Sequence, residues 1–208
     1  MTDLDDLPVA GTVVLLRPGA TADDRADGIE VLLVRRPGRG SFADAWVFPG
    51  GKVEESDRRA GDDEVDRARR AGIRETEEEV GLTVEDVVVL SRWQPPVEAP
   101  VRIRTWFFLA AAPAGDLHLS VDEVVDARWV SPAQALAHHA TGEWTLFPPT
   151  WMTLNQLSAT ESVDQALAGA GAARHFSTRV LAEGDGAVFA WEDLRLDTRS
   201  LPWTLSEG

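Results

Sequence analysis

The strongest constraint on the fold is a predicted helix over residues 62–80 that ends in four glutamates within five positions. Small or apolar residues recur along it at spacings of three and four, which is typical of a helix with one buried stripe. Gly81 follows at the position where a left-handed glycine commonly ends a helix. The stripe consists of Val65, Ala68, Gly72, Ile73, Thr76 and Val80.

The glutamates at this helix end should oppose folding. Glutamates three or four residues apart repel one another on a helix, and each anion near the C-terminus opposes the helix dipole by about 0.3–1 kcal/mol. Glu75, Glu78 and Glu79 stand at i, i+3 and i+4 and share a face, whereas Glu77 points elsewhere. A solvated acidic face is the ordinary interpretation of such a run. The alternative is a site for Mg²⁺ or Mn²⁺, since hard cations prefer clustered carboxylate oxygens.

The remaining pattern predicts an α+β protein in which a sheet packs against helices. Short β-rich runs occur at 9–16, 29–34, 45–48, 84–90, 103–111 and 124–130. Ser131-Pro132 and Pro148-Pro149 are typical helix starts, and a third short helix is expected over residues 161–168. A β-hairpin is expected from strands at 179–182 and 187–191. We expect one domain over residues 1–158, with residues 159–208 as a helix and hairpin extension packed on it.

Composition excludes several classes of protein. The formal net charge of −15 argues against nucleic-acid and anionic-membrane partners. The chain has no cysteine, so disulfides and thiolate sites are excluded. No apolar stretch is long enough to span a membrane, and the N-terminal sequence lacks signal-peptide features, so we expect a cytoplasmic protein.

A glycine motif lies upstream of the helix. Residues 48–51 read Phe-Pro-Gly-Gly, where glycines allow close backbone approach. With this motif, the chain resembles the Nudix hydrolases, whose box reads G-x5-E-x7-R-E-U-x-E-E-x-G-U with U aliphatic. The second half of the box matches at Arg74, Glu75, Glu78, Glu79, Gly81 and Leu82. The resemblance implies a Nudix-type α/β/α sandwich with a mixed β-sheet, followed by C-terminal helices and the β-hairpin.

The first half of the box does not match by simple counting. Counting back from Arg74 places Asp66 in the glutamate slot and Ala60 in the glycine slot. Gly51 is 23 residues before Arg74 instead of 14, so nine residues are extra, and we expect an enlarged loop before the helix. Asp66, Glu64 or neither takes the place of the first box glutamate. A long loop here resembles the coenzyme A diphosphatase-like subgroup, as do the neighbourhoods of Trp46 and Trp93.

The resemblance implies hydrolysis of a diphosphate linked to another moiety, with Mg²⁺ or Mn²⁺ as cofactor. Glu75, Glu78 and Glu79 would hold the metal together with the Gly51 carbonyl oxygen. Glu78 or Glu79 would act on the attacking water, and Arg74 would orient a carboxylate. Glu123, in a loop before a strand, is a further candidate acid or base, weighed against a plain surface glutamate.

Substrate contacts are expected from Arg36, Arg39 and Arg104 to the phosphates and from Trp46 to a nucleobase. Each of these arginines has an ordinary reading as a surface charge, and Trp46 as a packing residue. The expected partner is a small nucleotide diphosphate substrate, and the C-terminal hairpin is a candidate contact in a homodimer. The alternative function is a non-catalytic Nudix-like module that senses a nucleotide.

Overall fold

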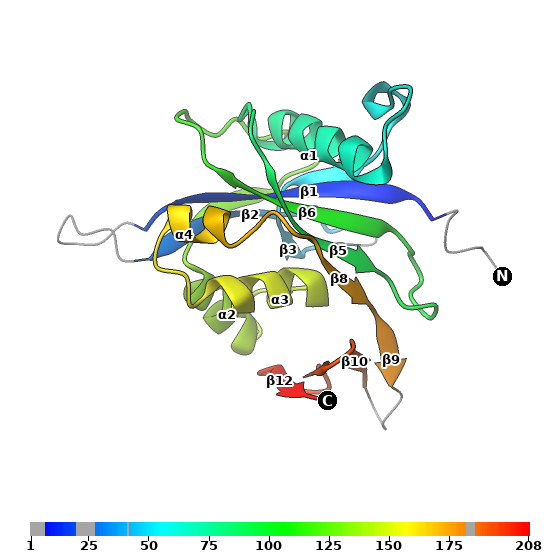
Figure 1. The fold of residues 1–208 in the computed structure, drawn as a ribbon. Helices are drawn as coiled ribbons and strands as arrows, with labels where there is room; N and C mark the ends of the chain where they lie inside the picture. The colour runs from blue at the N-terminus through cyan, green and yellow to red at the C-terminus, as the bar shows by residue number, and fades with distance from the viewer. Residues whose placement is uncertain (1–6, 20–27, 41, 182–185) are drawn as a thin grey trace.

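The protein is built around a mixed eight-stranded sheet (Figure 1). The computed structural model describes residues 7–19, 28–40, 42–181 and 186–208. The sheet order is β3-β2-β1-β6-β5-β8, with β4 paired to β1 and β7 paired to β2. The β1–β6 and β5–β8 pairs are parallel and the other pairs are antiparallel. Its strands are β1 (Val9–Pro18), β2 (Ile29–Arg35), β3 (Trp46–Val47), β4 (Gly50–Lys52), β5 (Val88–Gln94), β6 (Arg104–Ala111), β7 (Asp126–Val130) and β8 (Arg174–Ser177).

Helices cover both faces of this sheet, which makes the expected α/β/α sandwich (Figure 1). The longest helix, α1 (Glu64–Val80), lies on one face, where Val80 joins a buried cluster with strand residues such as Val13 and Leu15. On the other face lie α2 (Pro132–Ala140), α3 (Pro148–Leu157) and α4 (Val163–Ala168), which contribute to a larger apolar cluster. The predicted α+β class is therefore confirmed.

The position of α1 follows from its sequence. Asp63 caps its N-terminus by accepting a hydrogen bond of 2.9 Å from the Asp66 backbone N–H, and Gly81 ends it with a φ of +73°. A Cβ atom at Gly11 of β1 would overlap the backbone carbonyl of Ala68, so glycine is what lets α1 approach the sheet this closely. The close packing fixes the depth at which the glutamates of the last turns lie.

A second, four-stranded sheet is formed by the C-terminal segment. Its order is β12-β11-β10-β9, from β9 (Arg179–Leu181), β10 (Val188–Ala190), β11 (Leu194–Asp197) and β12 (Thr204–Glu207). The predicted hairpin is confirmed by antiparallel pairing of β9 and β10, and its turn lies mostly outside the described residues. The sequence did not predict β8, β11 or β12. Phe176 of β8 stacks on Trp93 of the neighbouring strand β5, with 3.9 Å between the ring centroids.

The predicted strand at 84–90 is wrong in its position. The observed strand, β5, begins at Val88 and continues to Gln94. Leu82 and Val84 are buried, but they pack as an irregular segment between α1 and the sheet. Strand limits are set here by the partner β6, which pairs with β5 from Val88 to Trp93, and local β-propensity does not carry that information. Within the described ranges no helix has the length and apolar character needed to cross a bilayer.

Candidate active site

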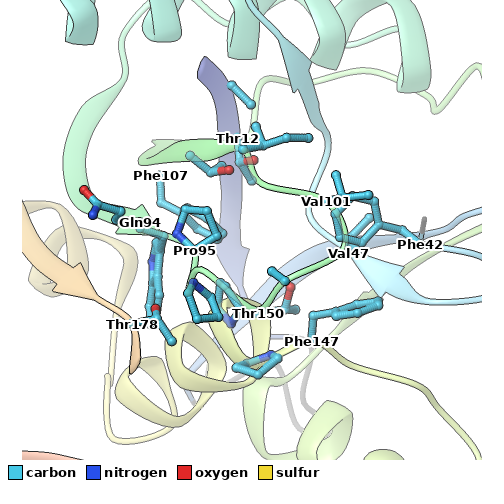
Figure 2. Close-up of a pocket in the computed structure, with 18 of the residues that line it drawn as sticks. Thr12, Phe42, Val47, Gln94, Pro95, Val101, Phe107, Phe147, Thr150 and Thr178 are labelled. Atoms are coloured by element: carbon cyan, nitrogen blue, oxygen red, sulfur yellow. The ribbon is translucent and has the colours of Figure 1, made fainter. Parts of the chain in front are cut away.

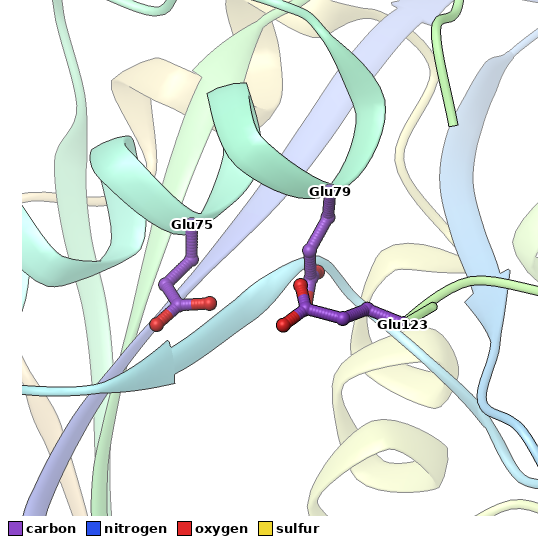
Figure 3. Close-up of side chains that lie close together, drawn as sticks. All are labelled: Glu75, Glu79 and Glu123. Carbon is purple, nitrogen blue, oxygen red and sulfur yellow. The ribbon is translucent and has the colours of Figure 1, made fainter. Parts of the chain in front are cut away.

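Three carboxylates converge at the C-terminal half of α1. Glu75 and Glu79 project from successive turns of the helix toward Glu123, which comes from the loop before β7 (Figure 3). One oxygen of each residue lies within 4.8 Å of the others. Carboxylates this close repel one another unless a cation or a proton neutralises them. The arrangement is therefore chemically suited to a divalent cation.

Glu79 is the most constrained of the three. Its side chain is 1% exposed, and it forms an ion pair with Arg36 through Oε1. Its Oε2 accepts a hydrogen bond of 3.1 Å from the Gly50 backbone N–H. Burial raises the pKa of Glu79 to about 7, although Arg36 and the Gly50 N–H both favour the ionised form. A carboxyl poised near neutrality is able to exchange its proton for a metal ion under ordinary conditions.

Arg74 organises the opposite side of the cluster. It donates hydrogen bonds of 3.0 Å to Glu75 and 2.8 Å to Glu78. It also makes two contacts to Asp57, of 3.2 and 3.0 Å, and these are the largest cause of the raised pKa of Arg74. Burial raises the pKa of the Glu75 carboxyl, and Arg74 opposes that shift. Arg74 thus holds Glu75 and Glu78 by their carboxylates.

Asp57 is the site residue that counting back from Arg74 missed. It lies in a short 3₁₀ helix, η2 (Glu55–Asp57), and is only 3% exposed. Five residues separate Gly51 from Asp57, which is the spacing of the first half of the Nudix box, with aspartate in place of glutamate. Sixteen residues, 58–73, separate Asp57 from Arg74 where the box has seven, so the nine extra residues all lie there. Counting forward from Gly51 would have found it.

The two residues considered for that slot lie elsewhere. Asp66 forms a surface ion pair of 2.6 Å with Arg69. Glu64, in the first turn of α1, accepts hydrogen bonds from Arg92 and Trp106 and pairs with Arg104. These contacts tie the start of α1 to the sheet. The Arg104 guanidinium is buried and pairs with Glu64, so we do not retain Arg104 as a substrate contact.

Glu78 does not join the three converging carboxylates in this structure. Its side chain is 53% exposed and forms an ion pair of 2.8 Å with Arg74. Glu78 and Glu79 are about 100° apart around the helix axis, so only one of them can face the core fully. Glu79 takes that place, and Glu77 is exposed, as expected.

Gly51 and two arginines surround the carboxylates. A Cβ atom at Gly51 would overlap the Glu75 carboxylate in its present position, so a larger residue there would displace that carboxylate. Arg36 donates a hydrogen bond of 2.8 Å to the Gly50 carbonyl oxygen, and Arg39 donates one of 3.0 Å to the Asp122 carbonyl oxygen, next to Glu123. Together these groups line a cavity of about 290 Å³.

Trp46 is placed differently from the other predicted substrate contacts. It is 4% exposed, belongs to the larger apolar cluster and stacks on Trp144 at 4.1 Å between ring centroids. A buried tryptophan already stacked on another offers little ring surface to a nucleobase. Trp46 is therefore a packing residue of the core, and we do not retain it as a substrate contact.

Comparisons with known proteins identify the family of the fold. The family model described as the NUDIX domain matches residues 10–150, more than half of the chain. Among curated proteins, none matches. A NUDIX hydrolase structure from Alicyclobacillus acidocaldarius is 25% identical with a TM-score of 0.69, and the match covers 78% of this chain and 96% of that one.

Two further structures share the fold alone. A MutT NUDIX hydrolase from Burkholderia pseudomallei is 22% identical with a TM-score of 0.52, covering 73% of this chain and 98% of that one. The NUDIX domain of Shewanella oneidensis NrtR, complexed with ADP ribose, is 17% identical with a TM-score of 0.52, covering 72% and 85%. From the matched domain and the hydrolase structure at 25% identity, the chain belongs to the NUDIX domain family and is a Nudix-type diphosphate hydrolase.

Proposed function

We propose that the protein hydrolyses the diphosphate bond of a nucleoside diphosphate linked to another moiety, with Mg²⁺ or Mn²⁺ as the cofactor. The observation that carries this proposal is the convergence of Glu75, Glu79 and Glu123 beside two arginines in one cavity. Nudix hydrolases generally depend on divalent metal ions, and this donor set consists of carboxylate oxygens, the ligands that hard cations prefer.

The metal would be held by Glu75 and Glu79, with the Gly51 carbonyl oxygen and Glu78 as further ligands. The missing side chain at Gly51 supports this assignment, because it keeps the space beside the Glu75 carboxylate open. When bound, a divalent cation would neutralise the diphosphate and lower the pKa of a bound water.

The other residues have distinct roles. Arg36 and Arg39 offer positive charge to the phosphates, and in the net negative field of this chain such local cations are needed. Arg74 holds the carboxylates of Glu75 and Glu78 in place. Glu123 reaches the cluster from another element and is exposed, so it is the candidate to accept the proton of the attacking water.

A coenzyme A-type compound is the first substrate to assay, because the box expansion before Arg74 resembles that subgroup. The full experiment is a hydrolysis assay with Mg²⁺ or Mn²⁺ against a panel of coenzyme A, ADP-ribose, dinucleotides and nucleotide sugars, with identification of both products. We expect two phosphorylated products from at least one compound. A wild-type protein that binds one compound tightly yet hydrolyses none would instead favour a sensing module.

A further inference from the structure

A second, larger cavity lies on the face of the sheet opposite α1 (Figure 2). It has a volume of about 900 Å³, enough for a group much larger than a phosphate. Its walls come from the main sheet, from the 95–101 loop, from the start of α3 and from the C-terminal strands β9 and β10. Thr12, Phe107, Phe147 and Thr178 mark four sides of it in Figure 2.

The lining of this cavity is mainly apolar. Aromatic rings and prolines provide most of it, among them Phe42, Trp93, Pro95, Phe147, Phe189 and Trp191. Among the described residues that line it, the charged ones are Arg36, Lys52 and Glu98. Uncharged polar side chains also line it, namely Thr12, Gln94, Thr105, Thr150 and Thr178. A strongly polar group would leave most of its polar atoms without partners against such walls, and each such atom costs free energy. An apolar group loses nothing there and gains from leaving water.

The cavity adjoins the carboxylate site. Arg36, Phe42, Gly50 and Gly51 line both cavities. Lys52, the only lysine of the chain, follows Gly51 and lines the larger cavity. It lies opposite Ala10 in the β1–β4 pair, so its side chain is on the cavity face, whereas the open side of Gly51 faces Glu75. The strand β4 therefore lies between the charged reaction site and this larger cavity, which we call the apolar chamber. Arg36 and Lys52 supply positive charge near the boundary.

One wall of the chamber is not part of the matched domain. Thr178, Val180, Phe189 and Trp191 all lie beyond residue 150, where the match to the NUDIX domain ends. Val180 and Phe189 are paired in register across β9 and β10. Trp191 packs edge-on against Trp93 of the main sheet, with ring centroids 5.6 Å apart, so the C-terminal sheet is fixed to the chamber it helps to enclose.

We propose that the moiety on the far side of the diphosphate is a large apolar organic group, which occupies this chamber, and that the C-terminal strands select for it. The proposal rests on the proposed diphosphate hydrolysis and names its substrate class. Arg36 and Lys52 would hold the diphosphate at the mouth. In the reaction a water oxygen forms a bond to one phosphorus as the bond from that phosphorus to the bridging oxygen breaks. The products are two phosphomonoesters, one carrying the apolar group, with two protons released near neutral pH.

The test uses a matched substrate series. Esters of ADP that carry a methyl, butyl or octyl group on the terminal phosphate are assayed for hydrolysis with Mg²⁺. The same series with a methylene group in place of the bridging oxygen is used for binding by calorimetry. We expect kcat/KM to increase by at least about 100-fold from methyl to octyl, since each buried methylene contributes severalfold. Binding of the methylene series should follow the same order.

Variants then test the C-terminal wall. Val180→Trp fills the chamber and should lower the octyl-to-methyl ratio of kcat/KM by at least about tenfold. Phe189→Asp places a charge in the same wall and should lower the binding of the octyl methylene analogue. The matched control is Arg179→Trp, at the neighbouring position on β9, where the side chain is exposed. It should leave both quantities as in the wild type, and circular dichroism with a melting curve confirms that each variant is folded.

The outcomes separate this inference from the proposed function. Hydrolysis that is independent of chain length overturns the apolar chamber and leaves diphosphate hydrolysis intact. Chain-length-dependent binding of the methylene series without hydrolysis supports the chamber and counts against hydrolysis. Equal loss of selectivity in Val180→Trp and Arg179→Trp overturns the role of the wall, and failure of every compound to bind overturns the chamber.

Discussion

At the scale of single residues, the chemistry depends on how deeply each glutamate is buried. Glu75, Glu78 and Glu79 have the same side chain, yet Glu79 is buried against Arg36, Glu75 is partly buried, and Glu78 is half exposed. Burial raises the pKa of the Glu75 and Glu79 carboxyl groups. They are therefore destabilising when ionised and without a metal, which is the condition that favours cation binding.

Replacement of Glu79 by glutamine should abolish hydrolysis without unfolding the protein. The amide cannot supply the negative charge that a cation requires, and loss of several kcal/mol of transition-state stabilisation corresponds to a decrease of about 100-fold or more in kcat/KM. Steady-state kinetics on the best panel substrate measures this. Glu77→Gln is the matched control because Glu77 is exposed on the same turn, and comparable losses in both variants would refute a specific role for Glu79.

The pH dependence of stability should also report on Glu79. Its pKa rises from the ordinary value of 4.5 to about 7 on folding, so the folded state binds more protons between these values. The stability of the metal-free protein should therefore fall as pH rises from about 4.5 to about 7. Burial lowers the pKa of His139, which acts in the opposite sense, so the comparison with Glu79→Gln is decisive. Melting curves in EDTA should show a smaller fall in the variant, and identical pH profiles would contradict the assignment.

At the scale of elements, the η2 segment and α1 form one unit around Arg74. Asp57 holds the Arg74 guanidinium, while Arg70 donates a hydrogen bond of 2.7 Å to the Asp57 carbonyl oxygen and pairs with Asp62. The nine extra residues thus extend the N-terminal part of α1 and form a loop that folds back onto it. The glutamates at the C-terminal end of α1 follow the expansion in the chain.

The change Asp57→Asn should weaken this unit. Loss of a charged partner from a largely buried arginine should cost about 1–3 kcal/mol of stability, and disturbed orientation of Glu75 should lower metal affinity by about 10–100-fold. Urea denaturation and a metal titration followed by activity measure the two effects. Asp66, on the surface of α1, is the candidate that counting back from Arg74 gave for the same slot. Asp66→Asn should leave both the stability and the metal affinity close to those of the wild type. A larger effect at Asp66 than at Asp57 would show that the box is aligned wrongly.

At the scale of the whole molecule, the sheet keeps two environments apart. The α1 face presents the carboxylates, and the other face presents the apolar chamber, with the Gly50-Gly51 segment lining both. The C-terminal segment is tied to the main sheet by the β5–β8 pair and by the stacking of Phe176 on Trp93, so it forms a fixed wall. Reaction site and chamber therefore belong to one folded unit.

Binding of a metal should stabilise the whole molecule. A ligand present at 100 times its Kd stabilises the native state by about 2.7 kcal/mol, which for a chain of this length raises the Tm by about 5–10 °C. Differential scanning fluorimetry with and without millimolar MgCl₂ or MnCl₂ would measure it. The increase should be largely lost in Glu79→Gln. An unchanged Tm in the wild type at saturating metal would argue against a metal site at this helix end.

Much of the fold was predictable because it depends on local pattern. Residue spacing and capping chemistry predicted the Ser131 helix start, the strands β1, β2 and β6, and a stripe on α1. Of that stripe Ala68, Gly72, Thr76 and Val80 are buried, whereas Val65 and Ile73 are only partly buried. The strand β5 was misplaced and β8 was missed, because both are defined by pairing with distant strands. Asp57 was missed because the counting began from Arg74, on the far side of the expansion.

The sequence by itself determined the family, the glutamate-bearing helix and the glycine segment beside it, since these depend on residues close together in the chain. Only the tertiary structure decided that the Glu123 carboxylate lies beside those of Glu75 and Glu79, that Glu78 pairs with Arg74, and that Asp57 holds Arg74. It also decided that the C-terminal strands enclose an apolar chamber next to the site. The reason is that burial and proximity between distant segments arise from the packing of the sheet and helices, and no local pattern encodes them.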